Sequence, residues 1–529
     1  MATVLQRRQL VNIPSAWLER VGQARTSCAP IVGYNQRRGV TTRDLDRRKG
    51  DRERVVILGS GWAGYTLSRE LDPKKYQPVV VSPRSYFVFT PLLASTSVGT
   101  LEFRTALESV RSQQTNVEFL QGWADDICLD KKSIVVEESV ADQSQGLALT
   151  GDRQKVHEDP EKVKAIKASK GGLFDLHYDK LIIAVGCYSQ TFGIKGVKEN
   201  AFFLKDVGDA RRIRRRILEC FETASLPTTS DKMRRQLLNF AVVGGGPTGI
   251  EFSAELHDLI KEDLAKLYPT LIDEFRITVY DVAPKVLSMF DENLGKYAMN
   301  HFHREGINIR TSHHPEELRL GVPQADQDDP SIRDKEGVYT LRTTEEGEVG
   351  VGMCVWSTGL MPNPFIQKTM SKVRRFPSPT ARIEGRYWER DEWYMKQDGR
   401  TKGVFTDDKL RVKLVSKPNG SEPVETVMKD VYAIGDCAVM EGTMYPATAQ
   451  VANQKAGWLA KRLNKDDTAE ETFAFKNRGI MAYLGNWRAI MQAGSGGNIS
   501  GRAAWFVWRG AYLTKSVSWR NRILIPIYW

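Results

Sequence analysis

The chain has 529 residues, 41% of them hydrophobic, and its charged residues give a net charge of +11. This length exceeds what one hydrophobic core supports, and no run of 18 apolar residues occurs, so we expect several domains and no transmembrane helix. Residues 1–50 contribute +7 and residues 472–529 contribute +8, which leaves −4 for the body and argues against a nucleic-acid-binding protein.

Residues 1–50 are predicted to be a mitochondrial targeting segment. Up to residue 43 they hold seven arginines and one acid, Glu19, with apolar residues that can form one face of short helices. Transit peptides are amphipathic, rich in arginine and poor in acids. A disordered basic tail is the alternative. Because no apolar anchor follows before the first strand near Arg54, we expect the matrix side of the inner membrane.

The first glycine-rich loop lies in RVVILGSGWAGYTLSREL, after an apolar run and before a helical pattern. Gly59, Gly61 and Gly64 have G-x-G-x-x-G spacing. In such loops the first glycine permits a tight turn, the second lets the backbone approach a pyrophosphate, and the third lets helix and strand pack closely. The helix that follows offers unpaired N–H groups to the phosphates. We therefore expect a bound dinucleotide here.

The segment after this loop departs from the usual pattern. An acid usually ends the second strand and binds the adenosine ribose, but here the strand PVVVS ends in Ser82, followed by Pro83 and Arg84. Arg84 could stack on adenine or meet a phosphate, and the sequence does not decide between them. The apolar stretch that follows, with Thr90 and Pro91 in its middle, could run beneath a flavin ring.

A second glycine-rich loop follows in LNFAVVGGGPTGIEFSAEL, where Gly244, Gly246 and Gly249 repeat the spacing. Its second strand, FRITVYD, ends at Asp281. That carboxylate suits a ribose 2′-OH and would repel a 2′-phosphate, which favours NAD over NADP. Two such loops indicate two dinucleotides and electron transfer between them. The alternative is that one loop is an ordinary strand–turn–helix connection.

Between and beyond the loops, the pattern alternates between elements and insertions. We expect a buried strand at 181–185, a charged helical stretch at 206–236, and a strand in MCVWSTG that ends near Gly359. Two polar stretches, 138–172 and 371–402, are predicted to be exposed insertions.

The end of the chain, from residue 503, combines aromatic with basic side chains. Residues at mostly helical spacing are Trp505, Trp508, Tyr512, Trp519 and Ile523. This pattern favours an interfacial helix that lies on anionic lipid, because Trp and Tyr prefer the membrane–water boundary and basic residues attract the headgroups. The alternative is a helix packed on the protein's own core or on a dimer partner.

Five short motifs together resemble the two-dinucleotide-binding-domain flavoproteins. They are GSGWAG, GGGPTGIE, AVG at 184–186, STG at 357–359 and AIGDCA at 433–438. Within that superfamily, PRSYFVFTPLL, TAQVANQ and AYLGNWRAI resemble the type II NADH:quinone oxidoreductases, the alternative NADH dehydrogenases of fungal and plant mitochondria. The resemblance runs from about Arg54 to Trp529 without the two insertions.

The resemblance implies an α/β fold of two Rossmann-like domains with C-terminal amphipathic membrane-binding helices. The FAD domain would be split into 51–215 and 366–472, around an NADH domain at 216–365. Residues 473–529 would form the membrane-binding region.

The resemblance also implies site residues, and no metal site among them. The residues expected at non-covalent FAD are Gly59, Gly61, Gly64, Ser82, Arg84, Thr90, Pro91, Val185, Gly186, Asp436, Ala449 and Val451. Those expected at NADH are Gly244, Gly246, Gly249, Asp281, Thr358 and Gly359.

Three further residues, Glu251, Gln450 and Gln454, are the catalytic candidates. In the family, the residue matching Glu251 contacts the nicotinamide side, and those matching the two glutamines line the meeting point of flavin and quinone. Gln450 and Gln454 are four apart and share a helix face, where neutral amides could donate to quinone or flavin oxygens. Surface positions for both are the alternative. Glu251 is expected in the first turn of its helix, where capping is the alternative role.

The expected function is NADH oxidation through FAD with membrane ubiquinone as acceptor, without proton pumping, by a peripheral protein of the mitochondrial inner membrane and a homodimer. A sulfide:quinone oxidoreductase is one alternative, with Cys187 and Cys354 as the plausible redox pair. A flavoprotein of the apoptosis-inducing-factor kind, acting mainly by binding, is another. Neither nucleic acid nor calcium is an expected partner, since the body is acidic and no EF-hand pattern occurs.

Overall fold

The computed structural model describes residues 41–111, 116–139, 171–332, 334–370, 372, 374–375, 392–417, 422–468, 470–494, 497–516 and 518–528. Most of the predicted targeting segment and of the two predicted insertions lies outside these residues. Helix α1 (Thr42–Lys49) belongs to a separate unit that ends at Gly50. Its N-cap is Thr41, whose hydroxyl accepts a hydrogen bond from the Asp44 amide at 3.1 Å.

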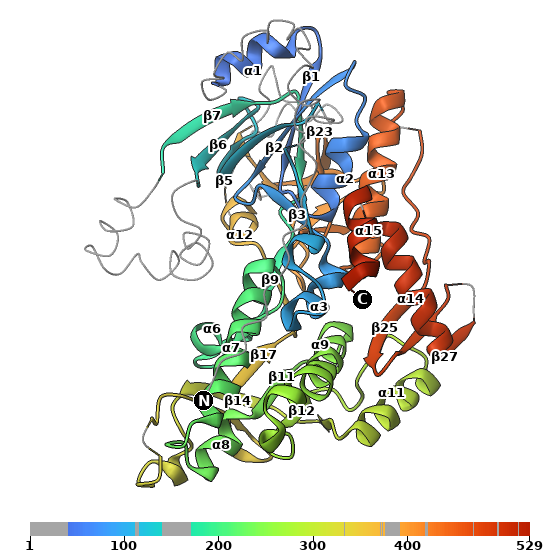
Figure 1. Ribbon diagram of the computed structural model, residues 1–529. Coiled ribbons are helices and arrows are strands. Elements are labelled where there is room, and N and C mark those ends of the chain that lie inside the picture. The colour runs from blue at the N-terminus through green and yellow to red at the C-terminus, as the bar shows by residue number, and fades with distance from the viewer. Residues whose placement is uncertain are drawn as a thin grey trace, which may run out of the picture. The chain divides into compact units, whose positions relative to one another are not determined.

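The larger of two main sheets is parallel at its centre (Figure 1). Along the sheet the strands are β19 (Arg374–Arg375), β20 (Glu392–Met395), β22 (Arg411–Ser416), β23 (Glu425–Ala433), β8 (Lys180–Ile183), β1 (Glu53–Leu58), β2 (Tyr76–Ser82), β5 (Glu118–Cys128), β6 (Ser133–Glu138) and β7 (Leu173–His177), with β21 (Val404–Thr406) and β24 (Ala438–Met440) to the side. The central strands β23, β8, β1, β2 and β5 run parallel. The middle of this sheet carries runs of buried apolar residues, 55–58 in β1, 79–81 in β2 and 181–183 in β8, as expected for parallel strands covered on both faces. Helices α2 (Trp62–Glu70) and α13 (Ala449–Lys465) pack together beside this sheet.

The second main sheet is entirely parallel. Its strands, in spatial order, are β10 (Phe202–Phe203), β17 (Met353–Trp356), β11 (Asn239–Val243), β12 (Arg276–Asp281) and β13 (Asn308–Thr311). Its helices are α7 (Val207–Ser225), α8 (Asp231–Leu237), α9 (Pro247–Asp258) and α11 (Glu292–Glu305). A small antiparallel sheet follows, of β14 (Pro315–Leu320), β15 (Tyr339–Thr343) and β16 (Gly347–Val351).

Two short strands join the main sheets. The chain leaves the larger sheet after β8 through β9 (Cys187–Ser189), and leaves the smaller one after β17 through β18 (Leu360–Pro362). The two strands pair in antiparallel fashion, Cys187 opposite Pro362. The outward and return connections therefore lie side by side.

The C-terminal region is a three-stranded antiparallel sheet followed by two helices. Its strands are β25 (Ile480–Gly485), β26 (Arg488–Gln492) and β27 (Asn498–Gly501), and its helices are α14 (Arg502–Lys515) and α15 (Trp519–Tyr528). β25 packs on α9, and α14 packs on β26 (Figure 1). No helix among the described residues is both long and apolar enough to span a bilayer.

Shorter elements connect these parts. They are β3 (Tyr86–Val88), η2 (Thr90–Leu92), α3 (Leu93–Val98), η3 (Phe103–Ala106), β4 (Leu107–Ser109), α6 (Val197–Asn200), the π-helical η5 (Leu259–Leu264), α10 (Ala265–Leu267), η6 (Pro269–Leu271), η7 (Gln324–Asp326) and α12 (Pro364–Met370).

The predicted elements are confirmed, with four corrections. The stretch 371–402, predicted to be an exposed insertion, contributes β19 and β20 to the larger sheet, and Trp393 and Met395 of β20 are buried. The strand expected at 181–185 ends at Ile183. The helical stretch 206–236 is two helices, α7 and α8, separated by a turn. The aromatic stripe predicted after residue 503 does not lie on one face, because Trp505 and Trp508 are buried on α14 while the side chain of Trp519 on α15 is exposed. The alternative of packing on the protein's own core is therefore correct for α14.

Candidate active site

The two glycine-rich loops have the same geometry. Each follows the central strand of its sheet, β1 or β11, and each first glycine has a positive φ, 108° at Gly59 and 114° at Gly244. A Cβ at Gly64 would lie 2.0 Å from the carbonyl oxygen of Gly59, and a Cβ at Gly249 would lie 2.0 Å from that of Gly244. The first and third glycines are thus required for the packing of helix on strand.

The middle glycines face open space instead. A Cβ on Gly61 or Gly246 would meet no protein atom within 4 Å. Both residues are the N-caps of their helices, α2 and α9, and neither makes a side-chain cap. The N–H groups in the first turns of α2 and α9 have no partner within their own helix, and they lie next to the two matching loops. This arrangement fits the pyrophosphates of two dinucleotides.

The loop after β1 lies beside other residues predicted to hold FAD. A Cβ at Gly59 would lie 3.3 Å from the Cα of Val185, just after β8. A Cβ at Gly435, the neighbour of Asp436, would lie 3.4 Å from the Cβ of Ala63 on α2 and 4.0 Å from that of Ala452 on α13. The carboxyl ends of β1, β8 and β23 and the start of α13 thus meet at one edge of the sheet, where doubly wound folds bind ligands.

Thr90 and the start of α13 border the same edge. The Thr90 hydroxyl accepts a hydrogen bond at 3.0 Å from the indole of Trp62, the first residue of α2. Helix α13 begins at Ala449, and the hydroxyl of its N-cap, Thr448, accepts a hydrogen bond from the Val451 amide at 3.4 Å.

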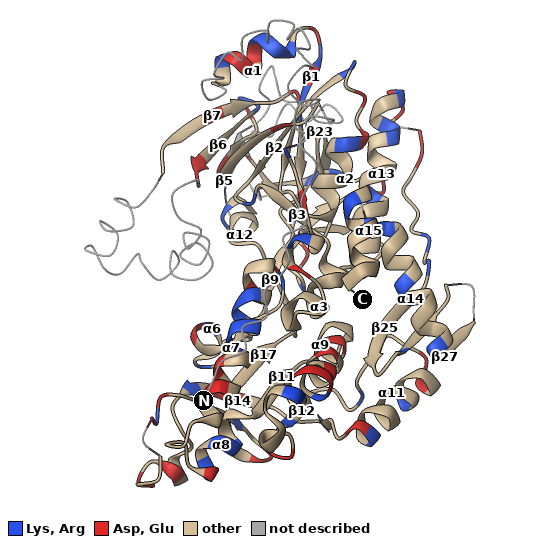
Figure 2. Cartoon of the chain, in the orientation of Figure 1, with Lys and Arg blue, Asp and Glu red and all other residues tan. Residues whose placement is uncertain are grey.

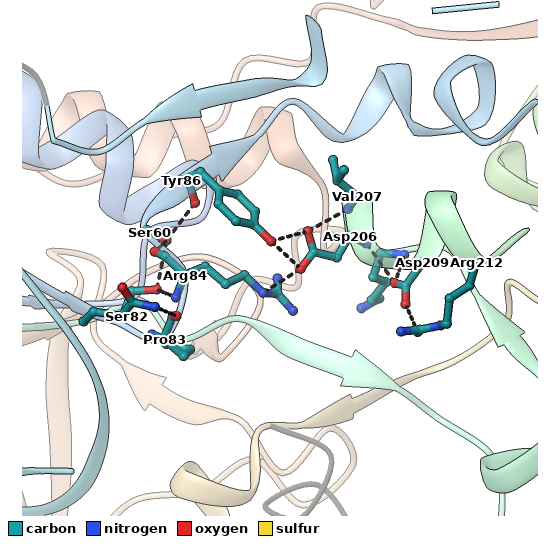
Figure 3. Close-up of polar contacts among 11 residues, drawn as sticks. Ser60, Ser82, Pro83, Arg84, Tyr86, Asp206, Val207, Asp209 and Arg212 are labelled. Carbon is teal, nitrogen blue, oxygen red and sulfur yellow. Dashed lines mark hydrogen bonds and ion pairs between the residues drawn. The ribbon is translucent and has the colours of Figure 1, made fainter. Parts of the chain in front are cut away.

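Arg84 is paired with a carboxylate that sequence reasoning missed. Its Nε lies 2.8 Å from Oδ2 of Asp206, the N-cap of α7, and the Tyr86 hydroxyl lies 3.3 Å from both oxygens of that carboxylate (Figure 3). Ser60, inside the first loop, lies 2.9 Å from the Ser82 hydroxyl and donates to the backbone carbonyl of Arg84 at 3.1 Å. Burial raises the pKa of Tyr86 to about 12, so its hydroxyl stays a donor. A carboxylate from a residue about 120 positions later than Tyr86 thus lies beside the segment that follows β2.

Asp281 lies at the end of β12, as predicted, next to the second loop. Its Oδ2 accepts a hydrogen bond from the Gly245 amide at 2.5 Å, and its Oδ1 accepts one from the Ala283 amide at 2.7 Å. A Cβ at Gly244 would lie 3.0 Å from the Cβ of Thr358, which precedes Gly359 in the turn after β17. The carboxylate is therefore held rigidly at the edge that also contains the glycine-rich loop.

Glu251 is not in the first turn of its helix, which begins at Pro247, so that prediction was wrong. Its carboxylate is buried and accepts hydrogen bonds from the Tyr483 amide at 3.1 Å and from the Trp508 indole at 3.3 Å. Burial raises the pKa of Glu251 to about 8. The side chain therefore joins α9 to the C-terminal region and does not cap the helix.

A second buried carboxylate lies one turn further along α9 and was not singled out from the sequence. Glu255 accepts hydrogen bonds from the hydroxyls of Ser95 at 2.6 Å and Thr100 at 2.9 Å. Burial raises its pKa to about 7. The spacing of four residues to Glu251 was the available signal, since it puts both carboxylates on one helix face.

Gln450 and Gln454 share one face of α13, as predicted, but their amides bind the chain itself. Gln454 exchanges two hydrogen bonds with the backbone of Lys476, at 2.8 and 3.0 Å. Gln450 accepts from the Arg478 amide at 2.7 Å and donates to the Gly479 carbonyl at 3.1 Å. These glutamines therefore fix the segment that leads into β25.

Lys455, next to Gln454, is buried, and no sequence signal drew attention to it. Its Nζ lies 5.9 Å from the ring centroid of Tyr445. Burial lowers its pKa to about 8, while the neighbouring Asp436 and Cys437 act in the opposite direction. A cation therefore lies close to the loop that contains Asp436.

The geometry does not favour a redox pair of Cys187 and Cys354. Cys354 is fully buried in β17, and burial raises the pKa of each thiol to about 12. The reactive species is the thiolate, which such a shift disfavours. The Cys187 thiol donates a hydrogen bond to Asp436 at 3.3 Å, and both cysteines are free.

Apolar side chains are exposed on both C-terminal helices. On α14 they are Phe506 and Val507; on α15 they are Trp519, Ile523 and Ile527. A groove of about 380 Å³ lies between the helices, lined by Phe506, Arg509, Gly510, Leu513 and Pro526.

Comparison with known proteins identifies the family. The profile described as pyridine nucleotide-disulphide oxidoreductase matches residues 53–375, and that of the NDH2 C-terminal domain matches residues 477–529. The chain is 35% identical to a probable NADH dehydrogenase of Dictyostelium discoideum, over 90% of this chain and 89% of that protein. It is 34% identical to the external NADH-ubiquinone oxidoreductase 2, mitochondrial, of Saccharomyces cerevisiae, over 90% and 80% of the two chains. The fold matches NDH2 from Plasmodium falciparum in complex with NADH, with a TM-score of 0.69 and 23% identity over 90% of this chain and 97% of that one. The chain therefore belongs to the type II NADH dehydrogenases, a family of FAD-dependent oxidoreductases that bind NADH.

Proposed function

We propose that this protein oxidises NADH through bound FAD and reduces ubiquinone at the surface of the mitochondrial inner membrane. The observation that carries the proposal is the pair of matching loops, each with a middle glycine that faces open space. The yeast relative is named as an NADH-ubiquinone oxidoreductase, and other relatives from plants carry similar names.

FAD would be held at the edge of the larger sheet. The residues assigned to it are Gly59, Gly61, Gly64, Ser82, Arg84, Thr90, Pro91, Val185, Gly186, Asp436, Ala449 and Val451. The arrangement of loop, helix N-terminus and Asp436 supports this assignment. These residues would hold a flavin, whose chemistry would be hydride acceptance from NADH and electron transfer to the quinone. The protein's own contribution is position and electrostatics, with Asp206 balancing the charge of Arg84.

NADH would be held at the edge of the smaller sheet, by Gly244, Gly246, Gly249, Asp281, Thr358 and Gly359. Asp281 is oriented by two backbone amides, which supports a role as acceptor for the ribose hydroxyls.

Glu251, Gln450 and Gln454 are proposed to shape the place where nicotinamide, flavin and quinone meet. Each of the three forms a hydrogen bond with a residue between 476 and 508. They would therefore affect the reaction by holding the C-terminal region in position. Because the pKa of Glu251 is raised to about 8, its carboxyl can hold or release a proton near neutral pH.

The exposed apolar residues of α14 and α15 support docking on an anionic membrane surface. Arg509 lies 4.5 Å from the ring centroid of Trp505, and Arg522 lies 5.1 Å from that of Trp519, so basic groups flank the apolar side chains. The groove between the helices offers a quinone a route from the bilayer. The matrix face of the inner membrane and a homodimer remain our predictions, to be tested by protease protection in mitochondria and by sizing in detergent.

The proposed domain boundaries follow the order of strands along the chain. Residues 51–215 and 366–472 form the two parts of the FAD domain, with 371–402 as an insertion, and 216–365 form the NADH domain. Strand β23, from the second part, pairs with β8 of the first, which supports the split. Residues 1–50 are the proposed targeting segment and 473–529 the membrane-binding region.

Anaerobic spectroscopy of the purified protein tests the function. NADH should bleach the flavin absorbance, and a short-chain ubiquinone should restore it. NADPH should act more slowly than NADH. A colourless protein that takes up no flavin would refute the proposal. Bleaching without recovery by quinone would favour a flavoprotein that acts mainly by binding, and bleaching by sulfide but not NADH would favour the sulfide:quinone oxidoreductase.

A further inference from the structure

We propose that Arg104, Arg211 and Arg214 form a binding site for the phosphate of an anionic phospholipid headgroup, beside the C-terminal end of α15. This inference rests on the proposed docking of α14 and α15 on a membrane. It adds a specific headgroup site, built by helix α7 and by η3, to the apolar contact.

Two of these arginines, Arg211 and Arg214, meet at the ring of Phe103, the residue that precedes Arg104 in the chain. The guanidinium carbon of Arg211 lies 5.2 Å from the ring centroid, and that of Arg214 lies 5.7 Å from it. The two arginines are three residues apart on α7 and so share one face of the helix. Stacking on an aromatic ring holds a guanidinium in place while its N–H groups stay available to an anion.

Neither stacked arginine has an ion-pair partner within the described part of the chain. Their neighbours on the same helix are paired: Arg212 with Asp209 at 2.5 Å, and Arg215 with Glu219 at 2.6 Å. Figure 2 shows the basic residues gathered on α7. Among the described residues, the helix therefore carries two arginines paired with acids next to two stacked arginines that form no ion pair.

The cluster borders the surface proposed for membrane docking. Arg104 follows Phe103 in the chain, and its guanidinium donates to the Tyr528 hydroxyl at 3.4 Å. Ile527, the residue before Tyr528, has 69% of its side chain exposed. Helix α15 is fixed in this position from its buried side, where Asn521 donates to the Glu108 carboxylate at 2.9 Å. Cationic groups are thus contiguous with an exposed apolar face.

The position of these arginines beside an exposed apolar face favours the phosphate of a lipid over other anionic ligands. The phosphates of the two dinucleotides have their own sites at the N-termini of α2 and α9, where the middle glycines leave space. The cluster instead lies on the sides of α7 and η3, next to the end of α15. Arginine is suited to a phosphate diester because its planar fork can donate two parallel hydrogen bonds.

Vesicle binding of the flavin-loaded protein tests the site with two matched double variants. R211Q/R214Q removes the two charges stacked on Phe103, and R212Q/R215Q removes two charges from the neighbouring arginines of the same helix that are paired with acids. Both are compared with the wild type on vesicles of phosphatidylcholine alone and on vesicles with about 20% phosphatidylglycerol. Bleaching by NADH serves as the check on folding and flavin content.

We expect R211Q/R214Q to bind the anionic vesicles about tenfold more weakly than wild type, with unchanged binding to neutral vesicles, and R212Q/R215Q to lose less than about threefold. Equal losses in both variants would overturn the site, since they would reflect overall charge only. Loss of flavin or a raised KM for NADH in R211Q/R214Q would also overturn it. A wild type that binds neither vesicle would refute the membrane docking itself, whereas a wild type that binds both, with R211Q/R214Q unaffected, would refute the headgroup site alone.

Discussion

The carboxylate of Glu251 accepts a hydrogen bond from the indole nitrogen of Trp508 at 3.3 Å, across 257 positions of the chain. The same oxygen accepts one from the Tyr483 amide, so a helix that follows a glycine-rich loop is tied to both a strand and a helix of the C-terminal region. Burial at this junction raises the pKa of Glu251 to about 8.

Glu251→Gln should make stability less dependent on pH. Between pH 4.5, the ordinary pKa of the group, and about 8, the wild-type carboxyl is protonated in the folded protein and ionised in the unfolded one. The stability that this proton supplies is complete below pH 4.5 and is lost as the pH rises through 8. Glutamine cannot ionise, and its oxygen can still accept both hydrogen bonds. We expect equal stability near pH 4.5 and an advantage of ~3 kcal/mol for the variant near pH 8, measured by urea unfolding.

Glu199, an exposed glutamate on α6, gives the control. Glu199→Gln should follow the wild-type profile closely, because its side chain is in contact with solvent. If the difference in free energy of unfolding between Glu251→Gln and wild type did not change across this pH range, the raised pKa would be contradicted.

Gly61→Ala and Gly64→Ala should separate cofactor binding from folding. Alanine at 61 meets no protein atom, so the flavin-free variant should unfold within about 0.5 kcal/mol of flavin-free wild type, yet lose most of its flavin. Alanine at 64 would place its Cβ against the Gly59 carbonyl and should prevent stable folding. Flavin absorbance and thermal melting measure both effects. Normal flavin content in Gly61→Ala would show that the pyrophosphate lies elsewhere.

Asp281→Asn should raise the use of NADPH relative to NADH. The negative charge of Asp281, beside the second loop, would repel a 2′-phosphate, and the substitution removes this charge. We expect the ratio of kcat/KM for NADPH to kcat/KM for NADH to rise about tenfold. Steady-state rates with both nucleotides measure it, and flavin content should stay unchanged. An unaltered ratio would count against the ribose role of Asp281.

Trp519→Ser and Ile523→Ser should weaken binding to neutral vesicles. Both side chains are exposed on α15, and burying either in lipid contributes ~2 kcal/mol, so a loss of at least about tenfold is expected for each. Leu267→Ser, at an equally exposed apolar position on α10, is the matched control and should bind normally. Equal losses for all three would indicate nonspecific adhesion.

Gln454→Ala should make the segment that precedes β25 less rigid. The variant loses both hydrogen bonds to Lys476, at a cost of ~1–2 kcal/mol, and the amides of 476–479 should exchange their hydrogens faster. We expect a higher KM for quinone with an unchanged rate of bleaching by NADH. Gln397→Ala, at a site whose amide donates only to Lys402, is the control. Slower bleaching in Gln454→Ala would instead put the side chain at the nicotinamide.

The local pattern was sufficient for the parts of the fold that depend on neighbouring residues. The spacing of Gly59, Gly61 and Gly64 and its repeat in the second loop predicted two strand–loop–helix units, because backbone approach and helix packing act within a few residues. The position of Asp281 followed for the same reason, since it ends the strand next to its loop.

The sequence could not give contacts between distant segments. Asp206 forms an ion pair with Arg84 because the start of α7 lies beside the segment that follows β2. The link from Glu251 to the C-terminal region could not be predicted, since its partners Tyr483 and Trp508 are more than 200 positions away in the chain. The sequence predicts one surface for Trp505 and Trp519 because the end of α14 at Lys515 and the start of α15 at Trp519 leave little trace in the pattern.

The partners of Glu251 come from residues 483 and 508, and those of Glu108 from residues 518 and 521, which are synthesised well after the residues they bind. A nascent chain can therefore complete both glycine-rich loops while the Glu251 carboxylate still lacks its partners. The same late segment forms the surface proposed for lipid contact. A chain that is terminated before this segment would therefore lack both the partners of Glu251 and the surface proposed to bind the membrane.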